Sequence, residues 1–215
     1  MKKEKRKTLR LVTSSVCLAL ATVMSMIKVF ELPFGGSVTL FSMVPVLVLS
    51  YMYGVKWGLL CGGVYGVLQM VLGATTTQAF AGLSGWSVPV MALLDYIVAF
   101  VVLGFAGVFK NKIINHTLAI SLGSALAVVL RLVCHFLSGW ILWGSYASGY
   151  FEEINNSFSS FVLSTFSGQA LSAMYSLVYN SSYMLPELVL SIVAVVVLMS
   201  VKPLKEKIIA GKESV

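Results

Sequence analysis

Residues 117–143 read TLAISLGSALAVVLRLVCHFLSGWILW, and this stretch decides the fold class. It is apolar over the length that a helix needs to cross the hydrocarbon core of a bilayer, about 20 residues. It also carries Arg131 and His135, two ionisable side chains that are costly to place in lipid. The stretch therefore predicts a membrane-spanning helix with one polar face turned toward a cavity or another helix.

The composition of the whole chain agrees with this interpretation. Of its 215 residues, 58% are hydrophobic and only 11% are charged, against about 25% charged in soluble domains. A soluble enzyme, a disordered chain and a disulfide scaffold are therefore excluded. The three cysteines share no motif spacing, so we expect no metal site and no disulfide framework. Nothing in the sequence calls for a cofactor.

Five further apolar runs predict five further spans. The complete set of predicted spans is 11–30, 38–54, 57–73, 87–109, 117–143 and 170–201. Thirteen of the fifteen lysine and arginine residues fall in 1–10, 55–56, 110–116 and 202–215. Basic residues favour the cytoplasmic side of a membrane. We therefore predict an all-α integral membrane protein with six transmembrane helices and both termini cytoplasmic. Its parts are a basic N-terminus (1–10), one membrane domain (11–201) and a basic tail (202–215).

The ionisable residues Asp95, Arg131 and His135 stand inside these spans and need an explanation. Asp95 lies in the fourth span, and Arg131 and His135 share one face of the fifth because they are four residues apart. An Asp95–Arg131 ion pair that pins two helices is one possibility. The neighbouring residues, Tyr96 and Trp143, favour an outward-facing ligand pocket instead.

The start of the last span adds further polar and aromatic groups. Tyr175, Tyr179 and Tyr183 follow one another at intervals of four residues, with Asn180 and Glu187 nearby. A belt of tyrosines at the membrane interface is the alternative interpretation of this stripe. A pocket of this composition suits a flat heteroaromatic ligand, since a carboxylate accepts from an exocyclic amine and aromatic faces stack on rings or attract a cation. An aminopyrimidine joined to a positive thiazolium would fit every part.

The chain carries no motif for an energy source or for hydrolysis. It contains no GxxxxGK[ST] phosphate loop, HExxH zinc motif or GxSxG elbow. A binder that depends on a separate motor is the simplest account. An intramembrane enzyme that uses Asp95 and His135 as acid and base is a less favoured alternative.

The chain resembles the thiamine-specific substrate-binding (S) component of energy-coupling-factor (ECF) vitamin transporters. The resemblance runs from about residue 11 to residue 200. It rests on GGSVTLFSMVPV at 35–46, YGVLQ at 65–69, LLDYIVAF at 93–100, RLVCHFLSGWILWGSYA at 131–147 and YSLVYNSSYMLPEL at 175–188. It implies a six-helix protein of the bacterial plasma membrane that binds thiamine near its extracellular side and is not an enzyme.

The resemblance also implies roles for particular residues. The thiamine-binding residues carried over from the family are Asp95, Tyr96, Arg131, His135, Trp143, Tyr175 and Asn180. Many members have Glu where this chain has Asp95. Members often close the site with a Trp in the first outer loop, where the nearest aromatic residue of this chain is Phe34. An S component for another vitamin or precursor, such as riboflavin or hydroxymethylpyrimidine, is the alternative function.

The partners that the resemblance implies are an ECF transmembrane subunit (EcfT) and two ATPase subunits. Members dock through an AxxxA motif on the first helix, and the corresponding residues are Ala19 and Val23. Val23 departs from that pattern. Cys17 and Ala21 form a second pair of small residues on a nearby face.

Overall fold

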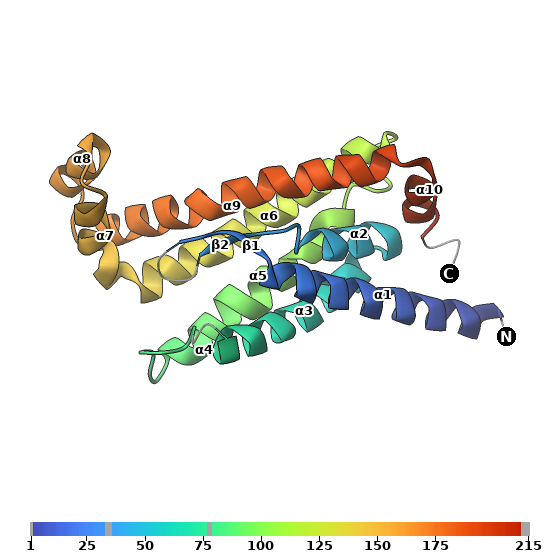
Figure 1. Cartoon of the computed structure of the whole chain (residues 1–215), viewed down its shortest axis with the longest axis horizontal. Coiled ribbons are helices and arrows are strands. Elements are labelled where there is room, and N and C mark those ends of the chain that lie inside the picture. Colours follow the sequence, from blue (N-terminus) through green and yellow to red (C-terminus); the bar gives the residue numbers. More distant parts are fainter. Residues whose placement is uncertain (1, 33–35, 77–78, 212–215) are drawn as a thin grey trace.

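The structure is a computed structural model that describes residues 2–32, 36–76 and 79–211. The described chain forms an elongated bundle of helices (Figure 1). The first turns of α1 (Lys2–Met26) and the short helix α10 (Lys202–Ala210) lie at one end of this bundle, the right-hand end in Figure 1. The predicted placement of both termini on one side of the membrane requires this arrangement. That this side is the cytoplasmic one stays a prediction.

Within the described residues, five helices are long and apolar enough to cross a membrane. Besides α1, they are α3 (Val55–Thr76), the composite helix Ser87–Gly107, α6 (His116–Leu142) and α9 (Gly168–Ser200). They overlap five of the six predicted spans. The predicted mainly helical membrane fold is therefore confirmed.

The second predicted span differs from its prediction. Only Val44–Tyr53 (α2) is helical, and ten residues of helix cover about 15 Å. Before it stands an antiparallel hairpin of β1 (Lys28–Glu31) and β2 (Ser37–Thr39). The predictions of helix over residues 27–30 and 38–43 are therefore wrong.

The local sequence accounts for this hairpin and for the short helix that follows. Pro45 stands in the first turn of α2, where its missing N–H and fixed φ suit the beginning of a helix. Val29, Phe30, Val38 and Thr39 are residue types that favour strands. Extended backbone is tolerated at membrane depth where protein buries it, and Val38 and Thr39 are both buried.

The composite helix Ser87–Gly107 departs from α-helical geometry in two segments, and the first of them carries Asp95. It consists of α4 (Ser87–Met91), a π-helical segment η2 (Ala92–Val98), α5 (Ala99–Val101) and a 3-10 segment η3 (Val102–Gly107). In η3, the Ser50 hydroxyl donates to the Gly104 carbonyl at 2.5 Å and accepts from the Gly107 N–H at 2.9 Å. The Ser50 side chain of α2 therefore hydrogen-bonds to two backbone groups of the fourth span. A side chain inserted among the backbone hydrogen bonds of a helix distorts that helix.

Short helices cover both ends of the bundle. The polar segment that follows α6 folds into η4 (Gly144–Tyr146), α7 (Ala147–Ile154) and α8 (Ser157–Thr165). These lie at the end opposite to α10 (Figure 1). At the α10 end, the Lys110 ammonium donates to the carbonyls of Met52 (3.2 Å) and Ile209 (3.0 Å), which ties α10 to the end of α2.

Helices α6 and α9 pack along one another and form one wall of the site. Gly139 permits their close approach, because a Cβ at this position would overlap the Ser176 hydroxyl and come within 3.0 Å of the Asn180 amide nitrogen. The room beside Gly139 is therefore occupied by α9.

Candidate ligand-binding site

Asp95 projects from the π-helical segment η2 toward α6. Its Oδ1 lies 2.8 Å from His135 Nδ1, and its Oδ2 accepts a hydrogen bond from the Ser138 hydroxyl at 2.5 Å. A π turn holds one residue more than an α turn, and such turns are frequent at functional sites. Both carboxylate oxygens of Asp95 are thus held by the neighbouring helix.

His135 links Asp95 to Arg131. Arg131 Nε donates to His135 Nε2 at 3.2 Å. Because Nε2 accepts, the proton of the neutral imidazole stands on Nδ1 and is donated to Asp95. Among the described residues, Asp95 and Arg131 form no direct ion pair. The alternative interpretation, in which such a pair holds the two helices together, is therefore wrong. The imidazole joins the two charges instead.

The Arg131 guanidinium is further held by an aromatic face. Its central carbon lies 4.2 Å from the centroid of the Phe100 ring. Such a contact stabilises a cation that has lost part of its water. The chain Asp95–His135–Arg131 is therefore balanced in charge, with one negative and one positive group.

Asn180 fastens α9 to the backbone of α6 at His135. Its amide nitrogen donates to the His135 carbonyl (3.2 Å) and to the Ser176 carbonyl (2.8 Å), while its oxygen accepts from the Tyr183 hydroxyl at 2.7 Å. The side chain is 5% exposed. Most of its hydrogen-bonding capacity is used within the protein, so Asn180 also positions the imidazole.

The tyrosine stripe faces inward. Tyr175, Tyr179 and Tyr183 are all buried, with ring centroids 5.8 Å and 6.0 Å apart along the series. Tyr150 of α7 meets Tyr175 and Tyr179 edge-on, at 5.1 Å and 5.9 Å. Burial raises the pKa of the Tyr150 hydroxyl. Buried rings against a cavity do not fit an interfacial belt, which would face lipid headgroups.

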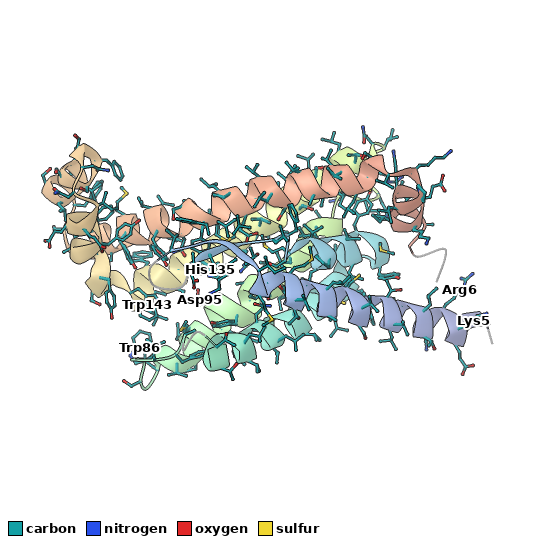
Figure 2. All side chains as sticks on the ribbon, viewed as in Figure 1. Lys5, Arg6, Trp86, Asp95, His135 and Trp143 are labelled. Carbon is teal, nitrogen blue, oxygen red and sulfur yellow. The ribbon has the colours of Figure 1, made fainter. Side chains whose placement is uncertain are left out.

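These groups surround one cavity of about 1040 Å³. Asp95, Tyr96, Arg131, His135, Trp143, Tyr175 and Asn180 all line it. Figure 2 shows Asp95, His135 and Trp143 close together between the helices, far from Lys5 and Arg6 at the other end of the molecule. The structure thus brings all seven predicted residues together, and their roles in binding stay predictions.

Trp143 and Tyr96 are held by aromatic neighbours. Trp143 is half-buried, with its ring centroid 5.9 Å from that of Tyr146. Tyr96 stacks on Phe80 at 5.6 Å. Both lining residues therefore present aromatic surface to the cavity from different helices.

The hairpin closes part of the cavity from the side of α1. The Gly36 N–H donates to the Tyr179 hydroxyl at 2.9 Å. The Thr39 N–H and hydroxyl donate to Glu187 Oε1 at 2.5 Å and 2.6 Å. Two contacts thus tie β2 and the residue before it to α9. Phe34, the predicted counterpart of the family's closing Trp, lies outside the described residues.

Sequence reasoning missed three residues that take part in these contacts. Ser138 stands three positions after His135 on the same helical face, and that spacing could have identified it. Glu187 carried a clear signal as an ionisable residue within an apolar run, yet it was noted only as a neighbour of the tyrosines. Thr39 carried no signal, because its contact depends on a hairpin that the sequence did not predict.

Burial distinguishes the two pairs of small residues on α1 that could dock a partner protein. Ala21 is fully buried, and its carbonyl accepts from the Tyr65 hydroxyl at 3.1 Å. Ala19 and Val23 are exposed on the other face. Only the Ala19–Val23 pair is therefore open to a partner protein, and docking at this pair stays a prediction.

A family model described as "Thiamine transporter protein (Thia_YuaJ)" matches residues 11–164 of the chain. The matched range includes five of the seven lining residues, from Asp95 to Trp143. Tyr175 and Asn180 stand beyond it.

Two curated relatives extend the likeness into α9. "Thiamine transporter ThiT" of Bacillus subtilis is 28% identical over 211 residues, which cover 93% of this chain and 95% of that protein. "Thiamine transporter ThiT" of Lacticaseibacillus paracasei is 26% identical over 174 residues, covering 76% of this chain and 73% of that protein. The chain therefore matches each relative over most of its length.

A solved structure has the same fold. It is that of ThiT from Listeria monocytogenes, with a TM-score of 0.66 and 21% sequence identity. The alignment covers 94% of this chain and 98% of the solved one. At this identity the likeness concerns the arrangement of the helices.

Proposed function

This chain belongs to the thiamine transporter protein family, and from that premise we propose that it is the thiamine-binding substrate-specificity subunit of an ECF-type vitamin transporter. It captures extracellular thiamine and delivers it through a partner module driven by ATP. Family membership confirms the predicted resemblance and the prediction that the chain is not an enzyme. With its membrane-length helices, the chain is a multi-pass protein of the bacterial plasma membrane.

The observation that carries the proposal is the composition of the cavity wall. Asp95 offers carboxylate oxygens to the exocyclic amine of an aminopyrimidine, and Trp143 and the tyrosines offer faces for two rings. Tyr96, Arg131 and His135 complete the polar wall. The volume of about 1040 Å³ lies at the upper end of the range for small-molecule sites, which leaves room for water beside the ligand.

The transport step is assigned to partner subunits. The sequence has no phosphate-binding loop, so energy must come from other chains. We propose an ECF transmembrane subunit and two ATPase subunits as the partners, with Ala19 and Val23 on α1 as the docking position. Both residues are exposed, as docking requires.

The experiment is a fluorescence titration of the purified protein in detergent. Trp143 lines the cavity, so thiamine should quench tryptophan fluorescence to saturation at one molecule per chain. Trp143→Phe should remove most of the signal, while Trp86→Phe is the control. Riboflavin and hydroxymethylpyrimidine serve as competitors. Failure of thiamine to bind, or tighter binding of either competitor, would contradict the proposal.

A further inference from the structure

Glu187 extends the tyrosine stripe by one turn. It stands four residues after Tyr183 on α9, and residues at this spacing share a helical face. Like the tyrosines it lines the cavity, and it is only 3% exposed. An ionisable side chain buried within an apolar helix marks a functional position by default, and a partner should be identified for it.

The contacts of Glu187 leave one oxygen unoccupied. Oε1 accepts from both the N–H and the hydroxyl of Thr39. Oε2 is buried and has no hydrogen-bond partner among the described residues. Two donors thus converge on one oxygen of Glu187, while the other oxygen is left to accept from a group that enters the cavity.

The charges around the cavity do not cancel. The charged lining residues in the described part of the chain are Lys28, Glu31, Asp95, Arg131 and Glu187. Lys28 pairs with Glu31 at 2.5 Å, and Arg131 is joined to Asp95 through His135. Glu187 remains as a carboxylate with no basic partner among the described residues. A buried charge of this kind is costly unless an opposite charge compensates it.

We infer that Glu187 is the counter-charge for the positively charged ring of the ligand, and that it sets the preference of the site for a cation over a neutral molecule of the same shape. The inference rests on the proposed function. Asp95 then faces the aminopyrimidine, while the cationic ring lies along the tyrosine stripe with Glu187 at its end.

The test compares thiamine with a neutral analogue in which a thiophene replaces the thiazolium. Both affinities are measured by calorimetry for the wild type and for Glu187→Gln, which keeps an acceptor for Thr39. We expect Glu187→Gln to weaken thiamine binding by about 10- to 100-fold, since a charge pair in a water-poor site is worth far more than in water. Binding of the neutral analogue should change by less than about threefold, because that analogue makes no charge pair.

Two control variants separate charge from hairpin closure. Glu153→Gln makes the same change in net charge at an exposed position of α7 outside the cavity lining, where solvent screens it, and should leave both affinities nearly unchanged. Thr39→Val removes one hairpin contact to Glu187 and should weaken both ligands by the same factor.

Several outcomes would overturn the inference. They are equal losses for both ligands in Glu187→Gln, no loss for either, or a loss confined to thiamine in Thr39→Val. A wild-type protein that binds no thiamine would instead overturn the proposed function, and the inference with it. Normal wild-type binding with an unselective Glu187→Gln would overturn the inference alone.

Discussion

Asp95, the proposed partner of the aminopyrimidine, is a cavity-lining residue whose geometry is fixed by its neighbours. His135 and Ser138 each form a hydrogen bond to one carboxylate oxygen of Asp95. Arg131 donates to the other ring nitrogen of His135. Asn180 in turn fixes the backbone of His135 from α9. A ligand that bonds to Asp95 therefore meets a carboxylate that is already oriented, which lowers the cost of ordering on binding.

Asp95→Asn should weaken thiamine binding by about 10- to 150-fold, the range for losing a hydrogen bond to a charged group. The change also leaves Arg131 without its negative counterpart, which opposes a cationic ligand. Calorimetry checks the affinity. Ser138→Ala is the control, because it removes one donor to Asp95 but keeps the charge, and its loss should be smaller. Affinity of Asp95→Asn within about twofold of the wild type, a change too small for a lost hydrogen bond, would exclude a direct role for Asp95.

At the residue scale, three ionisable residues of the site were predictable on physical grounds alone. Asp95, Arg131 and His135 could be identified because membrane physics leaves few reasons for charge within an apolar run. Ser138 carried only the weaker signal of its spacing from His135, since serine is common in membrane helices and is often structural. The link through His135 was not predicted, because spacing places residues on a face without giving their contacts across helices.

At the scale of elements, the hairpin and η2 are the parts that hydropathy could not predict. Residues 28–31 stand at the end of one predicted apolar run and residues 37–39 at the start of the next, and hydropathy carries no signal for their pairing in a hairpin. The π segment is set by packing, with Asp95 pulled toward α6. The long helices α3, α6 and α9 were predictable because length and hydropathy suffice for them.

The close approach of α6 and α9 leads to a separate prediction about Gly139. Gly139→Ala adds a methyl group that overlaps Ser176 and crowds Asn180. We expect it to cost about 1–3 kcal/mol of stability, as overpacking does, and to weaken thiamine binding by displacing Asn180. Thermal unfolding in detergent and calorimetry measure the two effects.

Gly149→Ala is the matched control, because a Cβ at Gly149 meets no atom within 4 Å. It should unfold at the same temperature as the wild type or slightly higher. If Gly139→Ala behaves like Gly149→Ala, the helices are not packed as tightly as the structure indicates.

At the scale of the whole molecule, the candidate ligand cavity and the proposed docking position occupy different surfaces. The cavity lies among η2, α6, α9 and the hairpin, whereas Ala19 and Val23 face outward from α1. The bundle shows α1 on the opposite side from α9 (Figure 1). A change on the outer face of α1 should therefore reach partners without reaching the ligand.

Ala19→Trp should reduce co-purification with the ECF transmembrane subunit at least tenfold while thiamine affinity stays within about twofold, because a bulky side chain prevents close approach of two helices in lipid. Val193→Trp is the control, an equally bulky change at an exposed position of α9. Pull-down from membranes and calorimetry on the isolated subunit give the two measurements. Co-purification of Ala19→Trp at the wild-type level would place the docking surface elsewhere.

The π segment η2 has a consequence for how the gene can change. One extra residue in a helical turn shifts the rotational phase between the parts of the helix before and after it. Loss of a single codon within 96–98 would leave an apolar helix of nearly the same length, yet it would change the position of Asp95 around the helix axis relative to α5 and η3, because the π turn would lose its extra residue. The carboxylate would then point away from His135. In this helix the number of residues is constrained as strictly as their identity, and single-codon deletions should be absent among functional descendants of this gene.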